Sequence, residues 1–366
     1  MRLAFILLLV VHGLIHLLGF LKAFQVAEIE QLTLPISKTT GVVWLLTSLL
    51  FLLTAFLFYT RIPWWWIIGT AALIISQILI ITYWFDAKFG TIANAVVVIA
   101  CVAGYGHWNF QNMVRDELNA LRSGVSRSDI ERSIRSQGSV PEIVQQWMDR
   151  SGIVHHDPIF TTSFQQTGRM KTNPDGRWMP VEAKQYVRLQ EPAFLWIADV
   201  RAAPLVHLTG RDKYLNGSGH MLIKLLSLVP VADSRGPKID QGTLLRYLAE
   251  MVWYPEAALH HYIEWEQLDA RSARATMRYR GISASGLFEF NDNGDPVRFE
   301  AERYYTRPDG ATLETWVVHI DENSYRLFNG IRVPTRARVS WKLEEGDFTW
   351  YELEISNLVF NGYPEL

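Results

Sequence analysis

Two histidines lie four residues apart in a long apolar run near the start of the chain. His12 and His16 share one face of a predicted helix, so their imidazoles could handle a proton, bind a small molecule or hold a metal. Gln77 and Asn94, in later apolar runs, could join them. Alternatively, both histidines are neutral, hydrogen-bonded to neighbouring helices and without a ligand. We favour this second interpretation and predict no metal and no cofactor, because these runs offer no nearby acidic or cysteine partner.

A second group of polar residues surrounds a predicted helix late in the chain. Arg246 and Glu250 are spaced i, i+4 and can form an ion pair, which on an exposed helix stabilises by only a few tenths of a kcal/mol, about 0.3 to 0.5. At the mouth of a cavity the same two residues could contact a ligand. The sequence predicts a ligand-binding group made of Trp196, His220, Lys224, Asp233, Arg246, Glu250 and Trp253.

Motifs that would identify an enzyme are absent from the sequence. There is no nucleophile elbow of the Gly-x-Ser-x-Gly type, no phosphate-binding Walker loop, no His-Glu-x-x-His and no Cys-x-x-Cys. This favours binding over catalysis. An enzyme acting on a hydrophobic substrate stays open as an alternative, and it would use His220, Asp233, Arg246 and Glu250 around one pocket.

These groups lie in two parts of the chain, one expected in the lipid bilayer and the other in water. Residues 1–106 carry only eight charged side chains and contain four apolar runs, 3–21, 41–60, 64–85 and 89–106. Each run has about the 20 residues that a helix needs to cross a bilayer. The sequence predicts a four-helix transmembrane domain over 1–106, a helical connector over 107–158 and a water-exposed domain over 159–366.

Charge gives an expected orientation and excludes one class of partner. With four spans, positive-inside counting leans toward the cytoplasm for the C-terminal domain of a multi-pass protein of the cell (inner) membrane. The membrane part sums to +2 and the remainder to −4, so a nucleic-acid partner, which needs a basic surface, is not expected. The sequence does not predict any protein partner.

The pattern beyond residue 160 indicates about nine or ten strands at hairpin spacing, typical of one large antiparallel sheet. One segment interrupts the series. Residues 239–253 have apolar side chains at i, i+3, i+4 and i+7, which predicts a helix. A single helix within a curved sheet is expected to cover the concave face, where apolar side chains would otherwise meet water.

The chain also resembles known families. The run from Gly219 to Asp233, the segment 245–250 with Trp253, and the segment 329–335 are similar to an uncharacterised bacterial domain of unknown function, the 6544 type, over about residues 164–360. That resemblance implies a fold like lipoprotein carriers, a half-barrel sheet with a helix over its concave face, and it implies no activity. Residues 19–22 and 86–90 of the membrane part resemble four-helix families of the DoxX type.

The sequence therefore predicts an α-helical four-span membrane bundle joined to a mostly antiparallel β half-barrel of the α+β class. The expected function is membrane-anchored binding of a lipid-like or other apolar ligand in the half-barrel, with the lipid bilayer and that ligand as partners. Besides the enzyme, a structural module that binds a partner protein and holds no ligand is an alternative, and a filled concave space would favour it.

Overall fold

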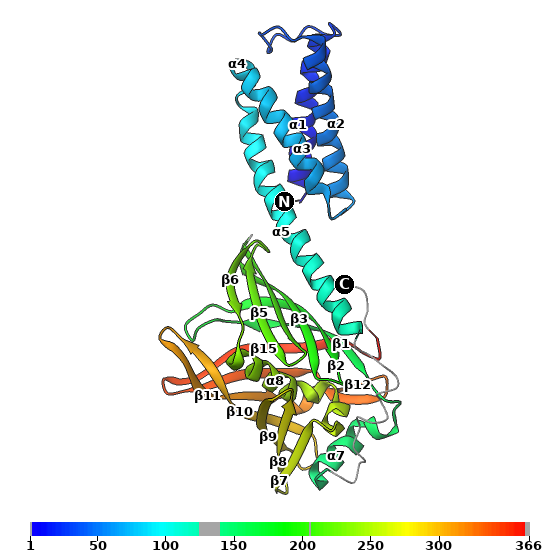
Figure 1. Ribbon diagram of the computed structural model, residues 1–366, viewed down its shortest axis with the longest axis vertical. Helices are drawn as coiled ribbons and strands as arrows, with labels where there is room; N and C mark the ends of the chain where they lie inside the picture. Colours follow the sequence, from blue (N-terminus) through cyan, green and yellow to red (C-terminus); the bar gives the residue numbers. More distant parts are fainter. Residues whose placement is uncertain (1, 124–139, 205, 363–366) are drawn as a thin grey trace. The chain divides into compact units, whose positions relative to one another are not determined.

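The computed structural model describes residues 2–123, 140–204 and 206–362, so part of the predicted connector, 124–139, lies outside the described residues. The chain divides into two compact units, Met1–Asn112 and Met113–Leu366. The first is helical, and the second is built around a large sheet (Figure 1). We describe each by itself.

The first unit contains four helices that are long and apolar enough to cross a membrane, in agreement with the four predicted runs. The long helices and the short α4 are α1 (Arg2–Ala23), α2 (Lys38–Tyr59), α3 (Trp65–Thr82), α4 (Trp84–Ala87) and α5 (Gly90–Ser123). Helix α5 has 34 residues, so the fourth apolar run and the start of the predicted connector form one continuous helix.

Helices α1 and α2 pack closely because glycines face large side chains. A Cβ added at Gly19 would lie 2.2 Å from Cδ2 of Trp44, and one added at Gly13 would lie 3.1 Å from Cβ of Phe51. Small residues that let helix backbones approach are the usual means of packing in a bilayer, where helices gain little from hydrophobic burial. A residue larger than glycine at position 19 would fit only if the ring of Trp44 or one of the two helices moved.

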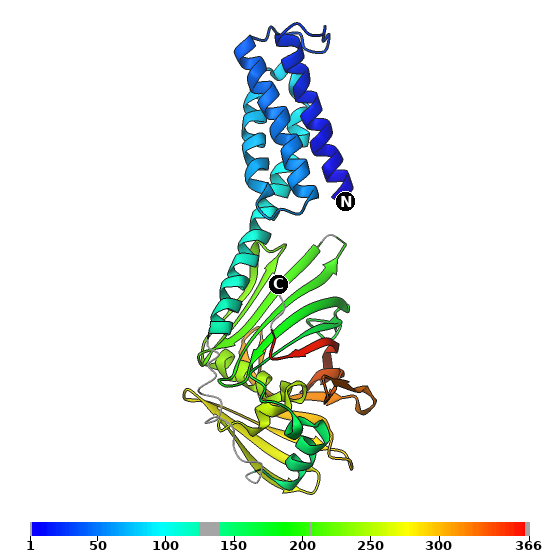
Figure 2. The same cartoon turned by 90° about the vertical axis from the view of Figure 1, so that its right-hand side faces the viewer.

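The second unit is built on a thirteen-stranded antiparallel sheet that curls into a half-barrel (Figures 1 and 2). Its strand order is β6-β5-β4-β3-β2-β1-β15-β14-β11-β10-β9-β8-β7. The strands are β1 (Thr161–Met170), β2 (Met179–Arg188), β3 (Ala193–Ala203), β4 (Val206–Leu215), β5 (Ser218–Leu225), β6 (Val229–Ser234), β7 (Ile263–Asp269), β8 (Ser272–Tyr279), β9 (Ile282–Phe290), β10 (Pro296–Arg307), β11 (Gly310–Ile320), β14 (Arg336–Leu343) and β15 (Gly346–Phe360). The expected sheet is confirmed, with more strands than predicted.

Helix α8 (Pro237–Glu250) lies over the concave face, as expected, and contacts β4 and β5 on one side and β8, β9 and β10 on the other. Gly236 precedes it at φ 106°, and Pro237 begins it, a favourable first helical residue. Two 3-10 turns, η4 (Met251–Trp253) and η5 (Pro255–Leu259), continue the chain across the same face.

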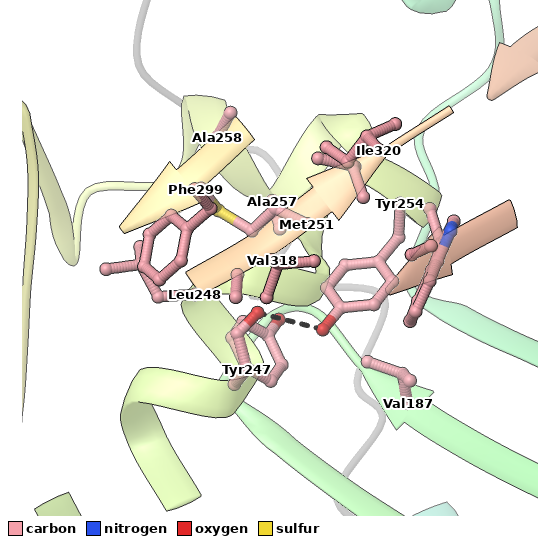
Figure 3. Close-up of a cluster of buried hydrophobic side chains, with 14 of the residues drawn as sticks. Val187, Tyr247, Leu248, Met251, Tyr254, Ala257, Ala258, Phe299, Val318 and Ile320 are labelled. Carbon is pink, nitrogen blue, oxygen red and sulfur yellow. Dashed lines mark hydrogen bonds between the residues drawn. The ribbon is translucent and has the colours of Figure 1, made fainter. Parts of the chain in front are cut away.

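Side chains from α8, η4 and η5 fill the centre of the half-barrel (Figure 3). Tyr247, Leu248, Met251 and Tyr254 are fully buried, and the hydroxyl of Tyr254 donates to the carbonyl of Tyr247 at 2.9 Å. This hydrogen bond satisfies a phenol that would be costly to bury alone. The middle of the concave face is therefore a packed core.

Smaller elements complete the second unit. They are α7 (Glu142–Ser151), the 3-10 turns η3 (Ile153–His155) and η6 (Glu322–Ser324), and the separate hairpin of β12 (Tyr325–Phe328) and β13 (Ile331–Pro334). Trp147 of α7 is 2% exposed and packs on Phe288 and Phe290. The helical segment predicted before the sheet thus forms part of the core.

Candidate functional site

The predicted site residues divide between the two faces of the sheet. Side chains alternate between faces along a strand, so Arg211 and Asp212 of β4 point in opposite directions. Arg246 of α8 contacts Asp212 on the concave side. His220 of β5 contacts Arg211 on the convex side.

On the concave side, Arg246 lies between two carboxylates. Its Nη1 lies 2.8 Å from Oδ2 of Asp212, and its Nε lies 2.8 Å from Oε1 of Glu250. The rings of Phe194 and Trp196 lie 5.0 and 4.9 Å from its Cζ atom, in the range of cation–π contacts. The expected pair of Arg246 and Glu250 forms, but with the two side chains only 14% and 11% exposed it lies inside the half-barrel and not on a solvated helix face.

Amide side chains extend this concave cluster across three strands. Gln185 of β2 accepts from Nη2 of Arg246 at 3.2 Å and donates to Glu250. Gln166 of β1 donates to Gln185 at 3.3 Å and accepts from the indole of Trp196 at 2.8 Å. Each of these polar groups thereby has a partner in a nearly closed environment, which is the condition for burying it without a large cost.

One cation in this cluster serves two carboxylates, so Arg246, Asp212 and Glu250 together carry a formal charge of −1. Burial alone would lower the pKa of Arg246, but the carboxylates of Glu250 and Asp212 outweigh burial and raise it. The guanidinium therefore stays charged at any pH at which the protein is folded. Truncating Arg246 would leave two carboxylates in a site of low polarity.

A second arginine points into the same part of the half-barrel. Arg303 of β10 stacks over Trp316 at 4.7 Å, and its Nε would lie 3.3 Å from a Cβ added at Gly242 of α8. Its partner in register, Glu314, is bound instead by Arg307 at 2.9 Å. Among the described residues no ion pair involves Arg303. Burial lowers its pKa to about 10, which leaves it cationic at neutral pH.

Trp253, predicted for the ligand group, is a core residue. It lies in η4, is 3% exposed and packs against Phe164 with ring centroids 5.4 Å apart. Its indole nitrogen has no hydrogen-bond partner in the part of the chain that the structure describes. Burial in the apolar centre therefore explains this tryptophan without a ligand.

On the convex side, a chain of polar contacts runs from helix α5 to the edge strand β6. Glu117 of α5 pairs with Arg211 at 3.0 Å and with Lys213 at 2.7 Å. Arg211 is 1% exposed and donates to Nδ1 of His220 at 2.8 Å, so the other ring nitrogen donates to Asp233 at 2.7 Å. Burial lowers the pKa of His220, in keeping with a neutral imidazole in this chain.

Lys224 lies in β5 four residues after His220, on the same convex face, opposite Thr209 of β4. The four residues of the enzyme alternative are therefore divided, with Arg246 and Glu250 inside and His220 and Asp233 outside. An enzyme that uses all four around one pocket is contradicted by this geometry. The physical reason is strand register. Neighbouring residues of a strand point to opposite faces of the sheet, and the sequence alone does not show which of the two sets faces the concave side.

In the first unit, both histidines face the interior of the helix bundle. His12 and His16 are 4% and 1% exposed, with ring centroids 4.7 Å apart. His12 donates from Nε2 to Asn94 of α5 at 3.0 Å, and Asn94 donates to Ser76 and Gln77 of α3, each at 3.0 Å. Asn94 and Gln77 are the partners that the sequence suggested.

His16 donates from Nδ1 to the carbonyl of His12 at 2.9 Å. Its Nε2 is buried without a hydrogen-bond partner among the described residues, and so is the indole nitrogen of Trp44, whose ring centroid lies 5.2 Å away. Helix α1 therefore presents its two imidazoles to three neighbouring helices. Among the described residues, the imidazole of His12 joins the polar network of Asn94, and that of His16 does not.

Several members of these clusters were not predicted. Gln166, Gln185 and Arg303 were missed. The first two are polar residues at inward positions of strands whose other inward residues are mostly apolar, and this pattern could have indicated a buried polar cluster. Ser76 was also missed, and a serine in an apolar run carries little information. Asp212 was likewise not among the predicted ligand residues.

Comparison with solved structures finds a domain described as a putative outer membrane lipoprotein-sorting protein domain from Vibrio parahaemolyticus. It has 11% identity and a TM-score of 0.35, and the match covers 63% of this chain and 95% of that one. None of the curated proteins matches the chain.

Comparison with protein families finds a match to DUF6920, a family of unknown function, over residues 138–360. The resemblance seen in the sequence was to the 6544 type, and the matching family carries a different number but covers the expected region. The half-barrel and inserted helix implied by that resemblance are present. The chain therefore belongs to the DUF6920 family of unknown function.

Proposed function

We propose that the second unit binds an amphipathic, lipid-like molecule on the concave face, with an anionic or polar head at Arg303. The observation that carries this proposal is the guanidinium of Arg303, which is directed into the half-barrel. Among the described residues, no carboxylate is in contact with it. Burial disfavours this guanidinium, the carboxylates of Asp212 and Glu250 attract it only from beyond contact distance, and an anionic group in direct contact would stabilise it further.

Half-buried apolar side chains support the proposal. They pack against the core yet stay partly open, in contrast to the closed centre beneath α8. They are Met170, Met179, Trp196, Leu208, Tyr305, Leu343 and Trp350. Large apolar surface around a few polar groups is the usual make-up of a ligand site.

Membrane anchoring supplies a source for such a ligand. The first unit has four helices long and apolar enough to cross a bilayer. We place the protein in the cell (inner) membrane with the second unit on the cytoplasmic side, from the charge count of the loops. A reporter fused after Leu366 tests this side, and activity of an extracytoplasmic reporter would contradict it.

A second candidate function is a structural module that binds a partner and holds no ligand. The filled centre of the half-barrel favours it, because Leu248, Met251 and Tyr254 occupy the space that a carrier would leave open. This alternative predicts that the purified protein holds no lipid.

Photocrosslinking tests the proposal and locates the ligand. The full-length protein in vesicles is irradiated with a diazirine-bearing fatty acid, digested and mapped by mass spectrometry. We expect crosslinks in peptides containing Trp196 or Leu208 as well as in the membrane helices. Arg303→Gln should reduce crosslinking by the acid more than by its methyl ester. Arg278→Gln, on the exposed side of β8, is the matched control. Crosslinks confined to the membrane helices would overturn the proposal.

A further inference from the structure

Exposed apolar side chains gather at one edge of the sheet in the second unit. Val206 begins β4, Leu226 follows β5, and Val229 and Val231 belong to the edge strand β6 (Figure 1). Their exposed fractions are 36%, 44%, 58% and 55%. The amide of Leu226 donates to the carbonyl of His207 at 2.9 Å, so the hairpin that joins β5 to β6 lies against the start of β4. We call these four apolar residues the hairpin patch.

The hairpin patch continues an apolar row on the concave face. Val200, Leu208, Leu225 and Val229 are in register across β3, β4, β5 and β6. Residues in register on an antiparallel sheet point to the same face, and Leu208 packs against the core. Val200 is buried, Leu208 and Leu225 are half-buried, and Val229 is exposed. Apolar surface therefore extends from the core of the half-barrel to its open edge.

Two cations lie beside the hairpin patch. They are Arg201 of β3 and Lys224 of β5, and among the described residues neither forms an ion pair. The acids on these strands and on β6, Asp199 and Asp233, are instead paired with histidines at 2.8 and 2.7 Å. Apolar side chains together with lysine and arginine are what hold a protein surface on anionic lipid headgroups. The charge beside the patch is therefore complementary to such headgroups.

The edge strand β6 is a poor template for a partner strand. Pro230 has no amide hydrogen to donate, and the register between β5 and β6 shifts at Lys224. The strand also has only six residues. Proline, irregular register and short length are means by which edge strands avoid pairing with other chains. A lipid surface needs no hydrogen-bond ladder, so it fits the patch better than an added strand.

The chain enters the second unit from the same end of the sheet. Glu117 of α5 binds Arg211 in the middle of β4, and the carbonyl of Leu121, one turn later, accepts at 3.4 Å from Arg188, the last residue of β2. The end of β2 is opposite the start of β4, because successive strands alternate in direction. Met113, where the unit begins, therefore lies toward the hairpin patch. Earlier residues form four helices apolar enough to cross a bilayer, so the chain carries its own membrane tether.

We propose that the hairpin patch docks on the surface of the bilayer. Leu226, Val229 and Val231 insert among the lipid headgroups, and Arg201 and Lys224 bind anionic headgroups. Docking in this way places the open edge of the apolar row against lipid. The proposal does not depend on whether the half-barrel holds a ligand, because it concerns only the exposed end of the sheet.

Fluorescent labels at single cysteines test the proposal. The only cysteine, Cys101, is replaced by alanine, and either Val229→Cys or Leu327→Cys is added and labelled with a nitrobenzoxadiazole dye. Leu327 is the control, since it is 70% exposed in the separate hairpin of β12 and β13. The full-length protein is placed in nanodiscs of phosphatidylcholine and phosphatidylglycerol in equal amounts, with or without a lipid that carries a nitroxide near its headgroup.

We expect the nitroxide lipid to quench the label at Val229→Cys several-fold more strongly than the label at Leu327→Cys. Acrylamide, a neutral quencher dissolved in water, should show the opposite preference. If acrylamide quenches both labels equally, the patch lies in water and the proposal is overturned. A label at Val229→Cys that is shielded from both quenchers would also overturn it, because a second copy or another protein would then cover the patch.

Reversing the two cations tests the contribution of the headgroups. Arg201→Glu with Lys224→Glu should reduce quenching of the label at Val229→Cys by the nitroxide lipid. Arg338→Glu with Lys342→Glu is the matched control, because both residues are exposed on β14 and the change in charge is the same. An equal reduction in the two double variants would contradict a role of Arg201 and Lys224 in binding anionic headgroups.

Discussion

The guanidinium of Arg246 and the carboxylate of Asp212 join α8 to β4 inside the half-barrel, with Nη1 and Oδ2 2.8 Å apart. The two side chains are 14% and 12% exposed. Helix α8 crosses the concave face and this pair fixes it at one side, so the position of the helix depends on charge as well as on apolar packing. Glu250 binds the same guanidinium, and the two acids share one cation.

Removing that cation should destabilise the protein strongly. Arg246→Ala leaves Asp212 and Glu250 in a nearly closed site, and breaking a buried pair in this way costs about 3 to 5 kcal/mol. Arg274→Ala is the control, since its pair with Glu266 has side chains 49% and 65% exposed and is worth about 1 kcal/mol or less. Thermal unfolding followed by circular dichroism compares them. Equal shifts in melting temperature would contradict the structural role of the pair.

Glu256 should make stability fall as the pH rises. It is 5% exposed, accepts from the backbone amide of Ile159 at 2.6 Å, and burial raises its pKa to about 7 from 4.5. The folded state therefore holds this proton more tightly than the unfolded state. The contribution of this proton to the free energy of unfolding is fully present below pH 4.5 and is lost as the pH rises to 7. The total loss is up to about 3 kcal/mol, since each pKa unit corresponds to roughly 1.4 kcal/mol.

Glu256→Gln keeps an acceptor for the amide of Ile159 and removes the proton. The difference in melting temperature between the variant and the wild type should grow from pH 4.5 to pH 7 and then level off. This difference removes the contribution of His260, because both proteins contain it. Burial lowers the pKa of His260 to about 3, so its effect on the pH dependence of stability is opposite in sign to that of Glu256. A difference that does not change with pH would show that Glu256 is charged in the folded state.

The turn between β5 and β6 should become more stable after two substitutions. Leu226 and Ser227 both have positive φ, 52° and 60°, which non-glycine residues adopt at a cost. Leu226 is also 44% exposed, so little burial is lost on replacement. The double change Leu226→Asn and Ser227→Gly, the preferred residues for this turn, should stabilise by about 1 kcal/mol and raise the melting temperature by roughly 2 to 4 °C. A lower melting temperature would show that the native side chains contribute more to the turn than their backbone strain costs.

In the first unit, His12→Leu should destabilise the helix bundle more than Leu14→Val. The first change leaves the side-chain oxygen of Asn94 without its histidine donor inside the bundle, whereas Leu14 is 48% exposed and keeps its apolar character. Thermal unfolding of the full-length protein in one detergent compares the two variants. If both have the wild-type melting temperature, the hydrogen bond from His12 contributes nothing to stability.

Much of the fold could be predicted because it depends on local patterns. Apolar runs about as long as a bilayer is thick predict the four spans, and the i, i+3, i+4 pattern around Leu244 and Leu248 predicts α8. Strand β7 was missed because Glu264, Glu266 and Asp269 make this edge strand look like a loop.

The site was predicted less well, because register decides which residues meet. His220 and Asp233 are close in sequence to Arg246, yet pairing between β4 and β5 places them on the other face of the sheet from that arginine. The pair of Arg246 and Glu250 follows from helical spacing alone. Its burial does not, since it depends on Gln185 and Asp212 from two distant strands.

Native mass spectrometry of the full-length protein, extracted in a detergent of known mass, tests binding by the half-barrel most directly. We predict a retained lipid that is lost in Leu208→Glu, a change on a half-buried residue packed against the core, and kept in Leu268→Glu, a change on a residue 42% exposed on the edge strand β7. A wild-type protein without lipid, or one whose lipid is retained equally by Leu208→Glu and Leu268→Glu, would contradict ligand binding by the half-barrel.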